Sequence, residues 1–293
     1  MEFILKRVIR RAKKIPKDIK SYKMRDSIIL NDLDRKANKN QMNLHWCSEK
    51  REDGIENIGD YLGVPIYDYM TKYYNLDKSA NFESTKHLYT VGSIIFFGKQ
   101  DAIIWGSGLL SNPLTLRKLS KKISLDIRAV RGPETRRELI KHGYDCPEVY
   151  GDPGILMPLI YKPNIKEKKS DYSVILHKSD KRRVKNQIDI LSDDYKVLID
   201  QIASSKKIIS SSLHGIILAE AYGVEAILLE DNRRDFSYFK YNDYYYSTGR
   251  MQYPVAKTIE EAIEMKAPKL PDLSELQQNI IDVFPKDIWK QQI

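Results

Sequence analysis

The sequence is poor in cysteine, with only Cys47 and Cys146 among 293 residues. Two cysteines cannot build a disulfide framework, so we expect a reducing compartment. The chain also lacks an apolar run of the ~20 residues that a membrane-crossing helix needs. At the start of the chain, Lys6 and Arg7 interrupt the apolar residues 3–5 before a signal peptide can form. From these absences we expect a cytoplasmic protein rather than a secreted or membrane-spanning one.

Histidine is scarce as well, and its five copies are scattered without the spacing of metal ligands. Asp32 and Asp34 match the aspartate pair that binds metal in some glycosyltransferases. They precede the first predicted strand and lie beside a basic segment, so we interpret them as a solvated loop. We therefore expect no metal and no cofactor.

The net charge of +9 is concentrated at one end of the chain. Residues 1–25 contain ten lysines and arginines against two acidic residues, which is +8 and leaves +1 for the remaining residues. A nucleic-acid enzyme more often spreads positive charge over its working face. No nucleic-acid partner is therefore expected.

Within this basic arm, residues 1–25, four apolar residues recur at helical spacing: Ile4, Val8, Ala12 and Ile15. They share one face of a helix that Pro16 would end. Such a helix can lie in an anionic membrane surface with its basic residues near the headgroups. The alternative is a helix docked on its own domain with a solvated charged face.

The rest of the chain alternates short apolar runs with amphipathic stretches, which indicates parallel sheets covered by helices. The expected strands are residues 42–46, 88–91, 102–105, 127–130, 172–176, 196–199, 207–210 and 226–229. The expected helices are residues 59–74, 132–142, 215–222, 259–265 and 273–283. Pro133 suits the first turn of its helix. We predict an α/β fold of two Rossmann-like domains facing a cleft, residues 26–165 and 166–293, joined by a polar linker at 162–171. The last helices are expected to pack back across the domains.

In open parallel sheets, ligands bind where strands turn into helices. The strongest such turn is Ser210-Ser211-Ser212, directly before Leu213 and His214. Free N–H groups at a helix start form an anion site, and His214 would place a proton donor beside it. The alternative, equally weighted, makes Ser212 an ordinary helix cap and His214 a satisfied core histidine.

Gly106-Ser107-Gly108 follows a buried strand and resembles the start of a dinucleotide fingerprint. The place of the third glycine is taken by Ser111, and no Walker lysine follows, so neither standard nucleotide site is supported. The glycines still permit a close approach of backbone to ligand.

Three further charged residues are candidates for the site: Arg131 after a predicted strand, Asp60 at a predicted helix start and Lys240 in an aromatic run. Arg131 can fork onto a carboxylate or phosphate, or form a surface ion pair with Glu134 or Glu138. Asp60, in the stretch that begins at Asn57, either caps a helix or accepts hydrogen bonds from substrate hydroxyls. Lys240 lies in an aromatic run, residues 236–246, as a candidate anion contact.

Seven short stretches together resemble the polysaccharide pyruvyl transferase family, in family order over about residues 42–250. They are Asn57-Ile-Gly-Asp60, Gly92-Ser93-Ile94-Ile95, Trp105-Gly-Ser-Gly108, Val130-Arg-Gly-Pro133, Gly151-Asp-Pro153, Ser211-Ser-Leu-His-Gly215 and Lys240-Tyr-Asn-Asp-Tyr244. The basic arm and the residues beyond about 260 lie outside the match.

The resemblance implies a fold like the B-type glycosyltransferases, with an active cleft between two Rossmann-like domains. It implies transfer of the pyruvyl unit of phosphoenolpyruvate onto two hydroxyls of one sugar, with release of phosphate. His214 would be the catalytic or donor-binding histidine, and Arg131 an anion-binding residue. The donor would bind to residues 166–293 and the acceptor to residues 26–165.

From these roles we expect His214 and Asp60 to be catalytic, with Asp60 orienting or deprotonating an acceptor hydroxyl. The donor-binding candidates are Arg131, Ser211, Ser212 and Lys240. The acceptor-binding candidates are Asn57, Asp60, Gly106, Ser107 and Gly108. The acceptor would be a sugar of a bacterial exopolysaccharide or capsule, carried on polyprenyl diphosphate at the cytoplasmic membrane face, where the arm would hold the enzyme. The alternatives are a B-type glycosyltransferase that uses a nucleotide sugar and a non-enzymatic binding module.

Overall fold

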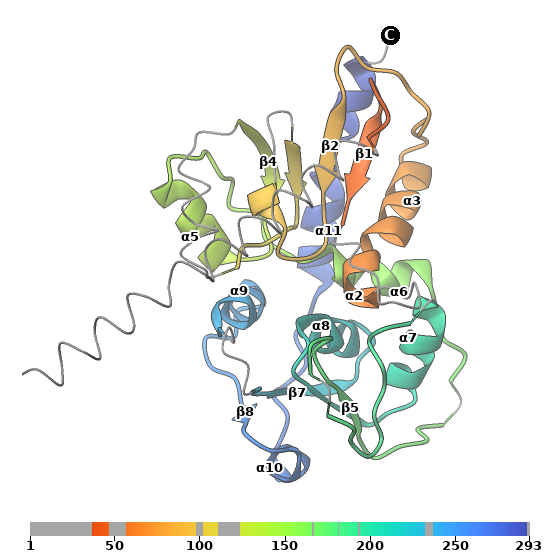
Figure 1. Ribbon diagram of the computed structural model, residues 1–293, viewed down its shortest axis with the longest axis vertical. Helices are drawn as coiled ribbons and strands as arrows, with labels where there is room; N and C mark the ends of the chain where they lie inside the picture. The colour runs from red at the N-terminus through yellow and green to blue at the C-terminus, as the bar shows by residue number, and fades with distance from the viewer. Residues whose placement is uncertain are drawn as a thin grey trace, which may run out of the picture.

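The protein is described by a computed structural model that places residues 37–46, 57–97, 102–110, 124–165, 167–180, 182–192, 194–231 and 237–291. The basic arm, Cys47 and the pair Asp32 and Asp34 lie outside these residues. The described chain forms two four-stranded sheets, one above the other in Figure 1. No helix among the described residues is both long and apolar enough to cross a bilayer.

The first sheet is entirely parallel, in the order β1-β2-β3-β4. Its strands are β1 (Met42–His45), β2 (Lys86–Tyr89), β3 (Ala102–Trp105) and β4 (Leu125–Ala129). All four residues of β3 are buried, as expected for a continuous apolar run in the middle of a parallel sheet. The strand predicted at 88–91 begins and ends two residues earlier, because the chain turns at Gly92 with a positive φ of 102°.

Helices flank the first sheet, and Asn57 and Asp152 cap two of the helical segments through their side chains. The helices are α2 (Ile58–Tyr61), α3 (Gly63–Tyr73), α5 (Pro133–Lys141) and α6 (Met157–Ile160), with 3-10 turns η1 (Ile95–Phe97) and η2 (Pro153–Leu156). Pro133 occupies the first turn of α5, as predicted. The single helix expected over 59–74 is divided into α2 and α3 at Leu62.

The second sheet is also entirely parallel, in the order β5-β6-β7-β8. Its strands are β5 (Ser173–Ile175), β6 (Lys207–Ser210), β7 (Glu225–Leu229) and β8 (Val255–Ala256), of which β8 was not predicted. Its helices are α7 (Tyr195–Ala203), α8 (Leu213–Ala221), α9 (Phe239–Ser247) and α10 (Ile259–Glu264). Two parallel sheets with helices confirm the mixed α/β class.

The strand predicted at 196–199 is wrong, since these residues lie in α7. Asp194 caps this helix by accepting a hydrogen bond from the Lys196 N–H at 2.8 Å. The buried residues Leu198, Ile199 and Ile202 share one helical face. A four-residue apolar run cannot distinguish a buried strand from the buried stripe of a helix.

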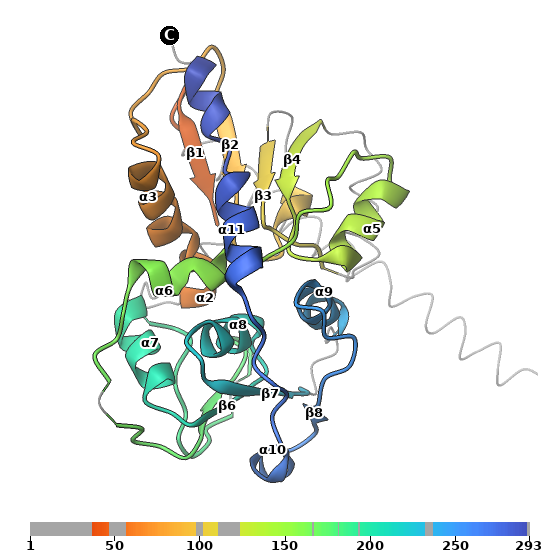
Figure 2. The ribbon, with the colours of Figure 1, turned by 180° about the vertical axis from the view of Figure 1, so that it is seen from behind.

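The last helices return from the second sheet to the first, as Figure 2 shows for α11 (Ser274–Asp282) and the 3-10 turn η3 (Lys286–Gln291). The Trp105 indole donates to the Ile280 carbonyl at 2.9 Å. Arg128 of β4 pairs with Asp287 at 2.8 Å, and this contact lowers the pKa of Asp287 below its ordinary value. The C-terminal segment therefore packs on the first sheet.

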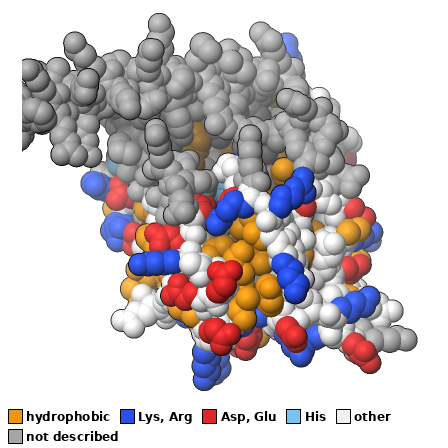
Figure 3. Space-filling view, turned by 60° about the horizontal axis from the view of Figure 1, so that its bottom comes forward, with side chains coloured by type: hydrophobic (Ala, Val, Ile, Leu, Met, Phe, Trp, Pro, Cys, Tyr) orange, Lys and Arg blue, Asp and Glu red, His pale blue; other side chains and the backbone are white. Residues whose placement is uncertain are grey.

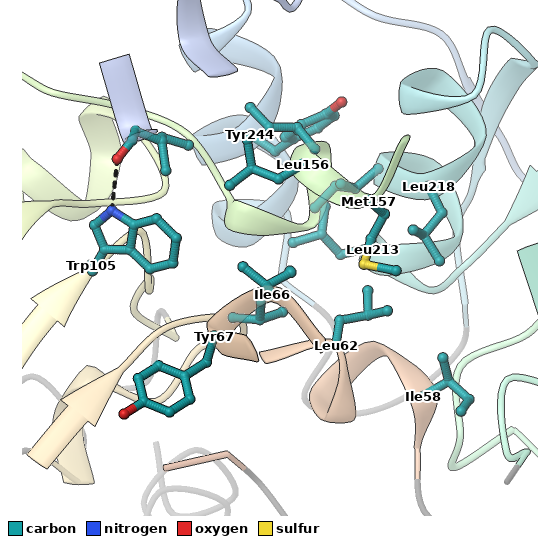
Figure 4. Close-up of a cluster of buried hydrophobic side chains, with 14 of the residues drawn as sticks. Ile58, Leu62, Ile66, Tyr67, Trp105, Leu156, Met157, Leu213, Leu218 and Tyr244 are labelled. Carbon is teal, nitrogen blue, oxygen red and sulfur yellow. Dashed lines mark hydrogen bonds between the residues drawn. The ribbon is translucent and has the colours of Figure 1, made fainter. Parts of the chain in front are cut away.

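A single hydrophobic core joins the two sheets. Figure 4 shows Ile58 of α2, Ile66 of α3 and Leu62 between these helices facing Leu213 and Leu218 of α8. Leu156 and Met157 fill the space between them, and Tyr244 of α9 closes the cluster. Because burial of apolar area is the main favourable term in folding, this shared core fixes α2 against α8.

A smaller apolar cluster covers the opposite face of the second sheet, built from residues of β5, β6, β7 and α10. Figure 3 shows the lower end of the molecule, where apolar side chains are surrounded by charged side chains of both signs. The two faces of the second sheet are thus both apolar, as expected for a parallel sheet.

Candidate functional site

The serine turn between β6 and α8, residues 210–212, is stabilised by hydrogen bonds of its own hydroxyl groups. The Ser210 hydroxyl accepts from the Ser212 N–H at 3.0 Å and lies 2.9 Å from the Ile175 carbonyl. The Ser211 hydroxyl accepts from the His177 N–H at 3.0 Å. Ser212 occupies the N-cap position of α8, but its side chain makes no capping hydrogen bond. The ordinary-cap interpretation of Ser212 is therefore wrong.

The first turn of α8 keeps its backbone donors. Within the described residues, no acceptor is found for the N–H groups of Leu213, His214 and Gly215. These N–H groups and the helix dipole together attract an anion. The turn can therefore bind a small, negatively charged group.

His214 lies at this helix start and is only 7% exposed. Its Nε2 is 3.7 Å from Oδ2 of Asp152, and both atoms are buried without a hydrogen-bond partner among the described residues. A buried polar atom without a partner costs about 1–3 kcal/mol. His214 is therefore not the satisfied core histidine of the alternative interpretation.

Asp152 reaches His214 from the segment that follows β4, the last strand of the first sheet. It precedes η2 and is fully buried, and its Oδ1 accepts from the Gly154 N–H at 2.9 Å. Sequence reasoning used the Gly151-Asp152-Pro153 stretch for the family resemblance but did not select Asp152 as a site residue. The available signal in the sequence was its place two residues after the apolar pair Val149-Tyr150. The structure places that pair beside the end of β4, where Tyr150 bridges Val130.

Asp60 lies in the first turn of α2, close to Lys178 of the segment that follows β5. Asn57, not Asp60, is the N-cap of this helix: its Oδ1 accepts from the Gly59 N–H at 3.2 Å. The Asn57 amide donates to Asp60 Oδ2 at 2.8 Å, and Lys178 lies 3.3 Å from the same oxygen. Lys178 follows β5 and was missed by sequence reasoning. The Asp60 carboxylate is therefore held by Asn57, from residues 26–165, and by Lys178, from residues 166–293.

The α2 helix is positioned tightly against α8. An ideal Cβ on Gly59 would fall within 3.0 Å of the His214 side chain, including Nδ1. The Ile58 N–H donates to the Ile190 carbonyl at 3.0 Å, and Asn57 forms a β-bridge with Leu191. Only glycine at position 59 permits this approach, so the structure brings Asn57 and Asp60 to the same helix junction as His214.

Arg131 is buried in a different environment from the one predicted. Its Nε donates to Asp243 at 2.9 Å, one terminal nitrogen to Ser93 at 2.7 Å and the other to the Leu109 carbonyl at 2.9 Å. The alternative of a surface ion pair with Glu134 or Glu138 is wrong, because Glu134 pairs with Arg137 and Glu138 with Lys141.

The Arg131 side chain is 0% exposed, which leaves no surface for a ligand in this conformation. Asp243 of α9 also accepts from the Thr135 N–H at 2.8 Å and from the Thr135 hydroxyl at 2.6 Å, and so holds the start of α5. This geometry supports a positioning role for Arg131, and its contact with a donor stays a prediction.

The Gly106-Ser107-Gly108 turn packs around the same arginine. Gly106 has a positive φ of 81°, and an ideal Cβ on Gly108 would collide with the Arg131 guanidinium. Ser107 is fully buried and donates to the Gly92 carbonyl at 2.8 Å. The described geometry gives these residues a structural role, and their contact with an acceptor stays a prediction.

Lys240 lies on α9, and its ammonium group is 4.9 Å from the centroid of the Tyr241 ring. The Tyr241 hydroxyl donates to the Ser211 carbonyl at 2.8 Å. Lys240 is therefore next to a residue that supports the serine turn, while its contact with a donor stays a prediction.

The described residues offer little for metal or thiolate chemistry. No group of three or more His, Cys, Asp or Glu among them is arranged to hold a metal ion. Burial raises the pKa of the Cys146 thiol to about 12, which keeps it protonated near neutral pH. Cys146 is therefore excluded as a thiolate nucleophile.

Comparison with known proteins gives one family and one relative. The polysaccharide pyruvyl transferase family model matches residues 57–233, which include Asp60, Arg131, Asp152 and His214. The uncharacterized protein L143 of Acanthamoeba polyphaga mimivirus is 36% identical over 151 residues, covering 47% of this chain and 51% of the relative. The chain thus spans about half the length of this curated relative.

Proposed function

The protein belongs to the polysaccharide pyruvyl transferase family, and from that membership we propose that it transfers the pyruvyl unit of phosphoenolpyruvate to a sugar of a surface polysaccharide. The family match supports a transferase of this kind. The observation that carries the choice of donor is the start of α8, where open backbone donors adjoin a buried histidine.

Phosphoenolpyruvate fits this helix start by its size and charge. It is a small molecule with a phosphate and a carboxylate, so it needs N–H groups and cations more than a nucleotide pocket. Ser211 and Ser212 shape the turn that would receive the phosphate. Lys178 and Lys240 are the cations that we propose to neutralise the carboxylate or the departing phosphate.

His214 is proposed as the acid that starts the reaction. A proton moves from the protonated His214 ring to the methylene carbon of the donor, which makes a methyl group and an oxocarbenium-like centre at the neighbouring carbon. One sugar hydroxyl attacks the oxocarbenium carbon, which carries the phosphate ester. The C–O bond between this carbon and phosphate then breaks, and the second hydroxyl attacks the same carbon to close the ketal ring. Of the two hydroxyl protons released, one protonates the His214 ring again and the other leaves with phosphate, so the atoms and charge balance.

Asp60 is proposed to hold or deprotonate an acceptor hydroxyl, with Asn57 fixing its orientation. A carboxylate is suited to this role because it only accepts hydrogen bonds and can take a proton. Asp60 belongs to residues 26–165 and His214 to residues 166–293. We therefore propose that the acceptor binds to residues 26–165 and the donor to residues 166–293, in a cleft where these two parts of the chain meet.

Binding of phosphoenolpyruvate tests this proposal directly. We expect phosphoenolpyruvate to raise the melting temperature of the full chain, because a ligand that binds only the folded state stabilises it by mass action. UDP- and GDP-sugars are tested separately for comparison, because they are the donors of the alternative B-type glycosyltransferase reaction. Stabilisation by a nucleotide sugar, with none by phosphoenolpyruvate, would favour that alternative and exclude the proposed donor.

We also propose that the basic arm, residues 1–25, holds the enzyme at an anionic membrane surface near a polyprenyl-diphosphate-linked acceptor. Each Lys or Arg close to such a surface contributes about 1 kcal/mol of attraction. Deleting residues 1–25 is expected to weaken binding to vesicles that contain phosphatidylglycerol, measured by cosedimentation, and to spare activity on a short soluble acceptor. Vesicles of phosphatidylcholine alone are the control, and equal binding of both chains to the anionic vesicles would contradict the proposal.

A further inference from the structure

The contact between Asp152 and His214 joins two buried side chains whose facing atoms have no hydrogen-bond partner in the described part of the chain. Asp152 is 0% exposed and His214 is 7% exposed. Asp152 Oδ2 and His214 Nε2 face each other at 3.7 Å, and neither has a hydrogen-bond partner among the described residues. A carboxylate kept only to cap η2 would need Oδ1 alone, which the Gly154 N–H already occupies at 2.9 Å.

We propose that Asp152 is a positioning residue for His214, which fixes the proton of the imidazole on Nε2 and leaves Nδ1 to exchange a proton with the substrate. This inference rests on the proposed function for its catalytic meaning, but not for its geometry. It assigns the two ring nitrogens to different tasks: Nε2 faces Asp152, and Nδ1 faces the α2 junction at Gly59.

The arrangement of the two oxygens explains why Asp152 can perform this task. Its Oδ1 is fixed by backbone, so the carboxylate cannot rotate freely, and Oδ2 is directed at the ring. A carboxylate can only accept a hydrogen bond, which requires that the facing nitrogen carry the proton. The distance of 3.7 Å is longer than a hydrogen bond, and such contacts in free enzymes commonly shorten when substrate binds.

The same pair would support the acid step. A protonated His214 carries one proton on each nitrogen, so that Nδ1 can deliver its proton to the methylene carbon of the donor. The neutral ring that remains has its proton on Nε2, which is the tautomer that Asp152 accepts. Nε2 therefore carries the proton that Asp152 accepts both before and after the transfer, and Asp152 itself does not touch the substrate.

Asp152→Asn separates this role from simple packing. The amide oxygen can still accept from the Gly154 N–H, and its NH2 group would then face Nε2 and require an unprotonated nitrogen there. The proton of the neutral ring is expected to move to Nδ1. In the proposed reaction, kcat would fall by about 10³-fold or more while KM for the donor changes little, as expected when the wrong tautomer is held.

The test is a long-range ¹H–¹⁵N NMR spectrum of the full chain labelled with ¹⁵N-histidine, in which the tautomer of His214 is identified directly. His214→Gln assigns the signal. We expect protonated Nε2 in the wild type and protonated Nδ1 in Asp152→Asn. Asp194→Asn is the matched control, because Asp194 also accepts from the N–H two residues later, and it should leave the His214 signal unchanged.

The inference is overturned if His214 in the wild type carries its proton on Nδ1, or if Asp152→Asn leaves the tautomer unchanged. Should Asp152→Asn not fold, the wild-type spectrum alone decides. Because this measurement needs no donor, it gives the same answer whether or not phosphoenolpyruvate proves to be the substrate. Failure of the proposed function would instead appear as the lack of stabilisation by phosphoenolpyruvate described above.

Discussion

Replacing His214 with glutamine is expected to lower the rate of phosphate release from phosphoenolpyruvate by about 10²–10⁴-fold, the range for loss of a general acid. Glutamine keeps a polar side chain of similar reach but cannot donate a proton to carbon. The α8 start itself should survive, since its serine turn is held by hydroxyl and backbone contacts outside the ring. The measurement is the rate of phosphate release in the presence of an acceptor sugar.

A matched control is His142→Gln, which changes a histidine at the end of α5. The His142 ring lies 2.7 Å from the Glu138 carbonyl, within its own helix, so its replacement should leave the rate near the wild-type value. Near-normal turnover in His214→Gln would remove this residue from the mechanism. A rate lost equally in both variants would indicate damage to the fold rather than to the chemistry.

Replacing Asp243 with alanine is expected to lower the free energy of unfolding by about 3–5 kcal/mol, because it leaves the Arg131 charge buried without its partner. Both side chains are 0% exposed, so water cannot compensate. The change also removes the acceptor for the Thr135 N–H and hydroxyl at the start of α5. Urea unfolding followed by circular dichroism measures the loss.

Asp68→Asn is the control for a charge removed from the surface. Asp68 pairs with Lys78 at 2.8 Å, but both side chains are about half exposed. Exposed pairs contribute about 0–1 kcal/mol. If the two variants lose similar stability, the buried pair does not hold α9 against α5, and the positioning role of Arg131 fails with it.

The sequence predicts most of the sheet architecture because apolar runs and turn residues are local signals. The bounds expected for β3 and β6 agree with the structure, and α8 ends where Gly223 follows it with a positive φ of 69°. The prediction of a strand at 196–199 was wrong because the apolar run there is too short to show a helical period. The strand β8, with two residues, gave no periodic signal at all.

The candidate site was only partly predictable, for a different reason. His214 and its serine turn were found because they follow a strand and begin a helix within a few residues. The partners of the site come from far along the chain: Asp243 is 112 residues from Arg131, and Lys178 is 118 residues from Asp60. Residue spacing carries no information about such pairs when no regular period links them.

The measurement that tests the central claim most directly is a crystal structure of the protein soaked with phosphoenolpyruvate. The account predicts the phosphate within hydrogen-bond distance of the N–H groups of Leu213, His214 and Gly215, with the methylene carbon facing Nδ1 of His214. Donor density at another place in the molecule, with the start of α8 empty and His214 unmoved, would contradict it.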